Sequence, residues 1–99
     1  MKNSVVIIIA KEIRGHCPVY REGDKMILNK YYIESKNSSN ICIHALTAMS
    51  TLLSAFAHGC SAIDLGIGSD ENVGFLQCPD PGICNGGGTV IFEIRKIAD

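Results

Sequence analysis

Residues 41–58 read ICIHALTAMSTLLSAFAH, and this stretch decides the fold because its apolar residues follow a helical repeat. They recur at three- and four-residue spacing, and the positions are Cys42, Ala45, Leu46, Met49, Leu52, Leu53 and Phe56. Ser39 or Asn40 is suited to cap the first turn, and Gly59 to the left-handed conformation that ends a helix. The sequence therefore predicts one long helix over residues 41–58.

The other side of this helix carries no charge. Asp, Glu, Lys and Arg are absent from residues 37–63, so the polar positions of the helix are occupied by Ser and Thr, with alanines between them. A helix without charged side chains is usually buried on more than one side, and in a small domain this favours a contact with another subunit. We therefore expect a homo-oligomer that forms through the uncharged helix 41–58.

Strand patterns lie on both sides of the helix. Residues 5–13 and 25–33 predict two strands that pair in antiparallel fashion across a longer connection. Residues 73–77 predict a short strand, and residues 89–97 alternate between apolar and charged side chains as a half-buried strand does. The order β-β-α-β-β predicts an α+β fold, in which a small antiparallel sheet of about four strands packs on one long helix.

Composition limits the class of protein. The chain has 99 residues, 46% of them hydrophobic, which suits a single α+β domain over residues 1–99. A formal net charge of −1 provides no basic surface of the kind that nucleic acid or an anionic membrane attracts, so neither is expected as a partner. The apolar run that starts at Val5 is too short for a signal-peptide core and is rich in β-branched residues, which favours a cytoplasmic protein.

Three of the five cysteines lie where a predicted strand or helix begins or ends. They are Cys17, Cys42 and Cys78, and prolines follow the first and the last of them. Such joints are the places where a fold can bring distant parts of a chain to one point. In the cytoplasm thiols are kept reduced, so an odd number of cysteines favours free thiols or metal ligands over disulfides. The sequence predicts a shared thiol site.

Four segments resemble a known family. They are EIRGHCP at 12–18, ICIHAL at 41–46, CPDP at 78–81 and GGGTVIFEIR at 86–95. The chain resembles a family of small, uncharacterised bacterial and archaeal proteins, found largely in anaerobes, with Cys-Pro near the start, Cys before the helix and Cys-Pro near the end. The resemblance spans nearly the whole chain and implies that Cys17, Cys42 and Cys78 belong together. It leaves Cys60 and Cys84 as extras and implies no activity.

Three dispersed thiolates suit an iron–sulfur cluster, because soft sulfur ligands bind iron strongly and can come from separate loops. We expect the ligands Cys17, Cys42 and Cys78, with a possible redox role. The fourth ligand could be His44, Cys84, a group from another subunit or an exogenous molecule. Zinc is the alternative metal. It ranks second because Cys42 and His44, two residues apart on a helix, would point in different directions.

Two further hypotheses stay open. The protein could be a metal-free oligomeric interaction module or small-molecule-binding module. It could also be a thiol-based redox protein in which Cys42, placed in the first helical turn, is the nucleophile and Cys17 or Cys78 resolves it. The glycines 86–88 precede a strand and not a helix, so we expect a flexible lead into that strand rather than a phosphate loop. Asp80 is expected to be one of several solvated loop carboxylates.

Overall fold

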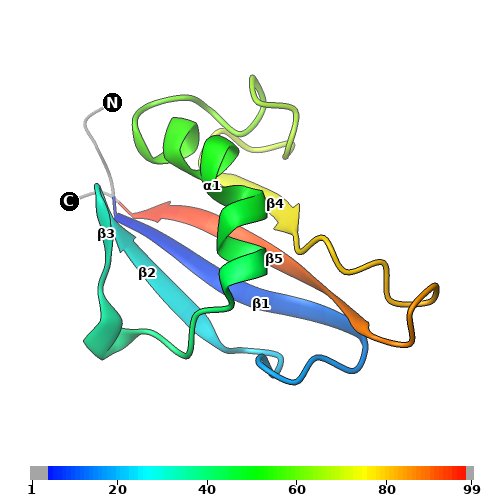
Figure 1. The fold of residues 1–99 in the computed structure, drawn as a ribbon. Helices are drawn as coiled ribbons and strands as arrows, with labels where there is room; N and C mark the ends of the chain where they lie inside the picture. Colours follow the sequence, from blue (N-terminus) through cyan, green and yellow to red (C-terminus); the bar gives the residue numbers. More distant parts are fainter. Residues whose placement is uncertain (1–4, 98–99) are drawn as a thin grey trace.

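The computed structural model describes residues 5–97 and contains one antiparallel sheet and one α-helix (Figure 1). The elements are β1 (Val5–Gly15), β2 (Lys25–Asn29), β3 (Tyr32–Ile33), a short 3₁₀ helix (Ser35–Asn37), α1 (Ile43–Ala57), β4 (Val73–Gln77) and β5 (Gly88–Ile97). The strand order is β3-β2-β1-β5-β4, and all neighbours are antiparallel. The α+β class is confirmed. No helix among these residues is long and apolar enough to cross a membrane.

The sheet has five strands, so the expected number of about four was too low. The single strand expected over residues 25–33 is interrupted by a tight turn at Lys30 and Tyr31, and Leu28 then pairs with Ile33 across a short hairpin. Lys30 adopts a left-handed backbone conformation with φ of 57°, which a non-glycine residue enters at a cost. The turn lacks the Gly, Asn-Gly or Pro signal that would have identified it.

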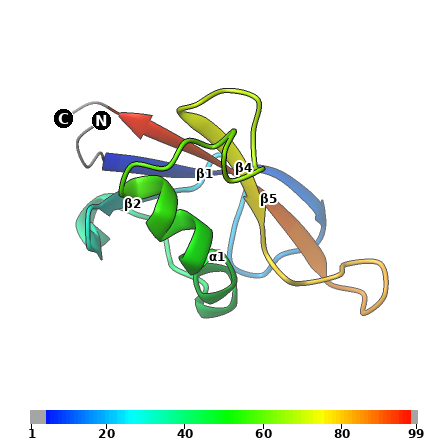
Figure 2. The same cartoon turned by 90° about the horizontal axis from the view of Figure 1, so that it is seen from above.

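Helix α1 covers one face of the sheet, and the core lies between them (Figures 1 and 2). The strands and the helix bury their facing side chains almost completely, and the largest of these are Val6, Ile8, Met26, Met49, Phe56, Val90, Phe92 and Ile94. The helical repeat predicted this burial correctly at Ala45, Met49, Leu53 and Phe56. Because the helix packs on one side only, the opposite face of the sheet has no α-helix from residues 5–97 on it.

A β-bulge in β1 changes which residues face the helix. Ala10 pairs with Phe92, but Glu12 pairs with Ile91, so Lys11 is the extra residue. Without the bulge, Glu12 would follow Ala10 onto the core side, because successive side chains alternate between faces. With the bulge, Ile13 lies opposite Val90 on the core side of the sheet. Cys17, four residues further along the chain, also packs against the core.

Helix α1 begins later than expected, at Ile43, with Cys42 in the N-cap position. The predicted caps were wrong because Ser39 makes a different bond, with its hydroxyl accepting the backbone N–H of Lys25 in β2. Cys42 therefore precedes the first helical turn instead of lying within it. The helix end was predicted correctly: α1 stops at Ala57, and Gly59 has a positive φ of 116°.

Candidate functional site

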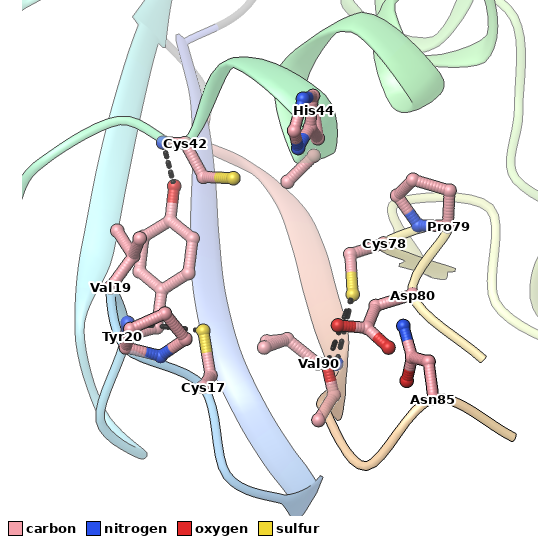
Figure 3. A pocket seen from close by; sticks show the side chains of 13 residues that line it. Cys17, Val19, Tyr20, Cys42, His44, Cys78, Pro79, Asp80, Asn85 and Val90 are labelled. Carbon is pink, nitrogen blue, oxygen red and sulfur yellow. Dashed lines mark hydrogen bonds between the residues drawn. The ribbon is translucent and has the colours of Figure 1, made fainter. Parts of the chain in front are cut away.

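The structure brings the three predicted cysteines to one pocket of about 350 Å³ at the N-terminal end of α1 (Figure 3). Cys17 comes from the loop after β1, Cys42 precedes α1, and Cys78 follows β4. The remaining residues that line the pocket are Pro18, Val19, Tyr20, His44, Ala45, Pro79, Asp80, Asn85, Gly88 and Val90. The three thiols, which are up to 61 positions apart in the sequence, thus border one space.

Backbone N–H groups donate hydrogen bonds to two of the three sulfur atoms. The Tyr20 N–H donates to Cys17 Sγ at 3.3 Å, and the Val90 N–H donates to Cys78 Sγ at 3.2 Å. Cys78 is the most enclosed of the three, with 7% of its surface exposed, whereas Cys17 and Cys42 are half-buried. The Cys78 thiol in turn donates to the Gly88 carbonyl at 3.8 Å. Hydrogen bonds to ligand sulfurs tune the reduction potential of iron–sulfur centres, so these donors are relevant to a site of that kind.

Cys42 lies at a helix terminus with unsatisfied backbone donors. The side chain of the N-cap residue Cys42 makes no capping hydrogen bond to the first turn of α1, and this turn contains no acidic residue. The N-terminus of a helix carries a partial positive charge, which favours a thiolate beside it. His44, in the same first turn, also lines the pocket. Because Cys42 precedes the helix, the geometric objection to Cys42 and His44 sharing a site does not apply.

Tyr20 links two of the thiols to the core. Its hydroxyl accepts the Cys42 N–H at 2.8 Å and donates to Met26 Sδ at 3.4 Å. Its ring packs edge-on against Phe92, with the ring centroids 5.3 Å apart. Burial raises the pKa of the Tyr20 phenol, so the hydroxyl keeps its proton and can make both bonds at neutral pH. Tyr20 therefore fixes the approach of Cys42 and, through its own N–H, the orientation of Cys17.

The variant Tyr20→Phe should lower the free energy of unfolding by about 1–2 kcal/mol, because the half-buried Cys42 N–H loses its acceptor while the ring stays in place. Urea denaturation followed by circular dichroism measures this. Tyr31→Phe is the matched control: Tyr31 is on the surface, so its loss of a hydroxyl should change stability by less than about 0.5 kcal/mol. Equal stability of the two variants would show that the Tyr20 hydroxyl does not hold Cys42.

Asp80 organises the loop between β4 and β5, which forms one wall of the pocket. Its carboxylate accepts the Gly82 N–H at 2.8 Å, and its carbonyl accepts the Thr89 hydroxyl at 2.6 Å. The Gly82 N–H, helped by the side chain of Asn85, holds the pKa of the Asp80 carboxyl below its usual value. The expectation that Asp80 is only a solvated loop carboxylate was therefore wrong. Asp80 and Asn85 are the pocket residues that sequence reasoning missed.

The Asp80 carboxyl should titrate below about pH 3.9, the usual pKa of an aspartate. A lowered folded-state pKa means that the contribution to stability is present above the unfolded pKa and is lost as the pH falls through the folded one. In a pH titration by NMR, the Gly82 amide resonance should move with this low midpoint, and Asp80→Asn should abolish the movement. A Gly82 midpoint at or above the usual value would contradict the hydrogen bond.

Cys60 and Cys84 are exposed and do not line the pocket. Of the two protein side chains predicted as a fourth ligand, His44 lies at the pocket and Cys84 does not, although its neighbour Asn85 does. The side chains of residues 5–97 include no group of three from His, Cys, Asp and Glu that could hold a single metal ion as they stand.

Comparison of the chain with protein-family models, with curated proteins and with solved structures found no match to any of them.

Proposed function

We propose that the protein binds an iron–sulfur cluster through Cys17, Cys42 and Cys78. The observation that carries the proposal is that these three thiols, from three separate joints of the fold, line one pocket of about 350 Å³. This volume lies in the range of sites for small ligands and cofactors. Backbone N–H groups donate to the sulfurs of Cys17 and Cys78, and Cys42 lies at the N-terminus of α1, which is the kind of surrounding that sulfur-ligated iron has in proteins.

The arrangement of donors suits a cluster better than a lone ion. A zinc ion needs its sulfur ligands at about 2.3 Å from one point. No three candidate donors of residues 5–97 are so arranged. A cubane cluster would take Cys17, Cys42 and Cys78 as ligands of separate irons, so its thiolates need not converge on one point. Thiols spaced around a pocket therefore support the cluster, and zinc is the second choice.

The other pocket residues would set the fourth ligand of a bound cluster and its exposure to water. Three protein thiolates leave room for a fourth ligand, and His44 lies at the pocket from the first turn of α1. Pro18, Val19, Ala45 and Val90 are apolar lining residues that would limit water around the metal. A cluster held there supplies one-electron redox chemistry, or a Lewis-acidic iron if the fourth position stays open.

The test is to purify the full chain without oxygen and to measure its visible absorbance, iron, zinc and acid-labile sulfide. A brown protein with broad visible absorbance and matching iron and sulfide is the expected result. Reconstitution with iron and sulfide under anaerobic conditions would restore a cluster that was lost during purification. Colourless protein after reconstitution, with five titratable thiols, would overturn the proposal and favour the metal-free binding module.

A thiol-based redox protein is the second candidate, and the uncapped helix terminus at Cys42 favours it. In this case the Cys42 thiolate attacks one sulfur of a substrate disulfide and releases the other sulfur as a thiol. Cys17 or Cys78, which border the same pocket, then attacks Cys42 in the mixed disulfide, so that the second substrate thiol leaves and a protein disulfide forms. Alkylation of metal-free protein near neutral pH, followed by peptide mass spectrometry, separates the two candidates. Preferential labelling of Cys42 over the exposed Cys60 and Cys84 supports the nucleophile.

A further inference from the structure

The first half of strand β1, from Val5 to Ala10, is apolar on both of its faces. Val6, Ile8 and Ala10 are buried on the core side, and Val5, Ile7 and Ile9 alternate with them on the other side. An antiparallel sheet with one face in water normally alternates apolar and polar residues, whereas a continuous apolar run is typical of a strand that is covered on both faces. The run from Val5 to Ala10 therefore indicates that something covers the second face of the sheet.

The strand register shows how far this apolar surface extends. We define the open face as the side of the sheet opposite α1 (Figure 2). Ile7 pairs with Ile27 in β2, and Ile9 is linked through Glu93 in β5 to Phe75 in β4, so these side chains share this face across four strands. Its apolar members are Val5, Ile7, Ile9, Ile27, Val73, Phe75, Ile91 and Ile97. Phe75 and Ile97 are 46% and 42% exposed, and the other apolar members of this face are half-buried.

Charges of both signs lie on the open face, next to each other. The Arg95 guanidinium contacts the Glu93 carboxylate at 3.2 Å, and Glu93 is only 7% exposed although no helix formed by residues 5–97 lies over it. A second pair, Arg14 and Glu12, follows the same pattern at the far end of β1. In a two-fold contact, if an acid of one copy contacts a base of the other, the same pair forms again with the copies exchanged. A surface that carries adjacent acids and bases can therefore complement itself. A partner of single charge sign would not match this surface.

We propose that the open face is the contact between two copies of this chain, which stack sheet on sheet about a two-fold axis. Two strands of about 35 Å and two of about 17 Å, spaced about 4.8 Å apart, give a flat area of about 500 Å². Projecting side chains raise the accessible area of this surface toward the roughly 800 Å² that each partner buries in a stable complex. The solvent side of α1, the contact expected from the sequence, carries the exposed Ile43 at its first residue and otherwise mainly small side chains such as Thr47 and Ser50. The open face groups eight apolar residues on four neighbouring strands, so it is the contact we infer.

The two surfaces can be separated by substitution. Phe75→Lys and Ile27→Lys each place a charge on the open face without touching the core. Two matched controls lie elsewhere: Ile83→Lys, at a position that is 98% exposed in the loop between β4 and β5, and Ser50→Glu on the solvent side of α1. Sedimentation velocity of the full chain at micromolar concentration gives the oligomeric state. Circular dichroism checks that every variant folds.

We expect a dimeric wild type, about 30-fold or greater weakening of dimerisation by Phe75→Lys and Ile27→Lys, and unchanged dimers for both controls. A monomeric wild type, dissociation by Ser50→Glu alone, or folded Phe75→Lys dimers of wild-type affinity would each overturn the proposal. The thiol pocket is on the α1 side of the sheet, so open-face variants should keep any bound metal. Failure of the dimer and failure of the cluster are therefore distinguishable.

Discussion

Replacing Cys17 with serine should remove nearly all bound iron and sulfide from the protein, and Cys42→Ser and Cys78→Ser should do the same. A serine hydroxyl stays protonated at neutral pH and is a poor ligand for iron. Removing a group that only hydrogen-bonds to a metal ligand lowers metal affinity by about 10–100-fold. Removing one of three ligands should lower the affinity for the cluster by at least as much. Iron and sulfide analysis after anaerobic reconstitution measures the effect.

The remaining cysteines provide the controls for this series. Cys60→Ser and Cys84→Ser remove exposed thiols outside the pocket, so both variants should retain the iron content of the wild type. Cys17→Ser is the most informative change, because Cys17 is half-buried, whereas Cys78→Ser also places a hydroxyl in the core. Full iron content in a folded Cys17→Ser protein, or its loss in Cys84→Ser, would contradict a site built from Cys17, Cys42 and Cys78.

The sequence predicted those parts of the fold that depend on regular spacing. The helical repeat located α1 to within two residues at its start, and the alternating pattern located β4 and β5. Two features were not predictable in this way. The hairpin at Lys30 lacks the usual turn residues. The bulge at Lys11 inserts one residue where the strand changes from apolar to charged side chains, and no glycine or proline marks the place. Both are set by pairing with other strands, which local sequence does not record.

The site was predictable to the extent that it depends on the ends of strands and helices. The positions of Cys17, Cys42 and Cys78 at such joints predicted their meeting, and His44 follows from its place in the first turn of α1. The hydrogen bonds that shape the pocket were not predictable. Asp80 interacts with groups on its own loop, and Ser39 bonds to β2 instead of capping α1. Such choices depend on tertiary distances.

The glycines 86–88 were expected to provide flexibility, and the structure gives Gly87 and Gly88 a different role. Gly88 belongs to β5 and is paired with Gly15 at the end of β1. A Cβ on Gly88 would lie 2.5 Å from the His16 carbonyl carbon and 2.6 Å from its oxygen. A Cβ on Gly87 would collide with the Asp80 carboxylate. Close approach of two backbones, next to Cys17, is therefore what requires glycine here.

The variant Gly88→Ala should destabilise the protein by about 3 kcal/mol or more, since its methyl group meets backbone atoms that cannot rotate away. The displaced segment carries His16 and Cys17, so a folded fraction should also lose bound iron. Gly86→Ala is the control: its φ of 75° is strained for alanine, but no atom lies within 4 Å of the added methyl, so the cost should be about 1–2 kcal/mol. Urea denaturation of the metal-free proteins compares the two directly. Equal losses at both positions would mean that backbone conformation, and not the contact with His16, accounts for Gly88.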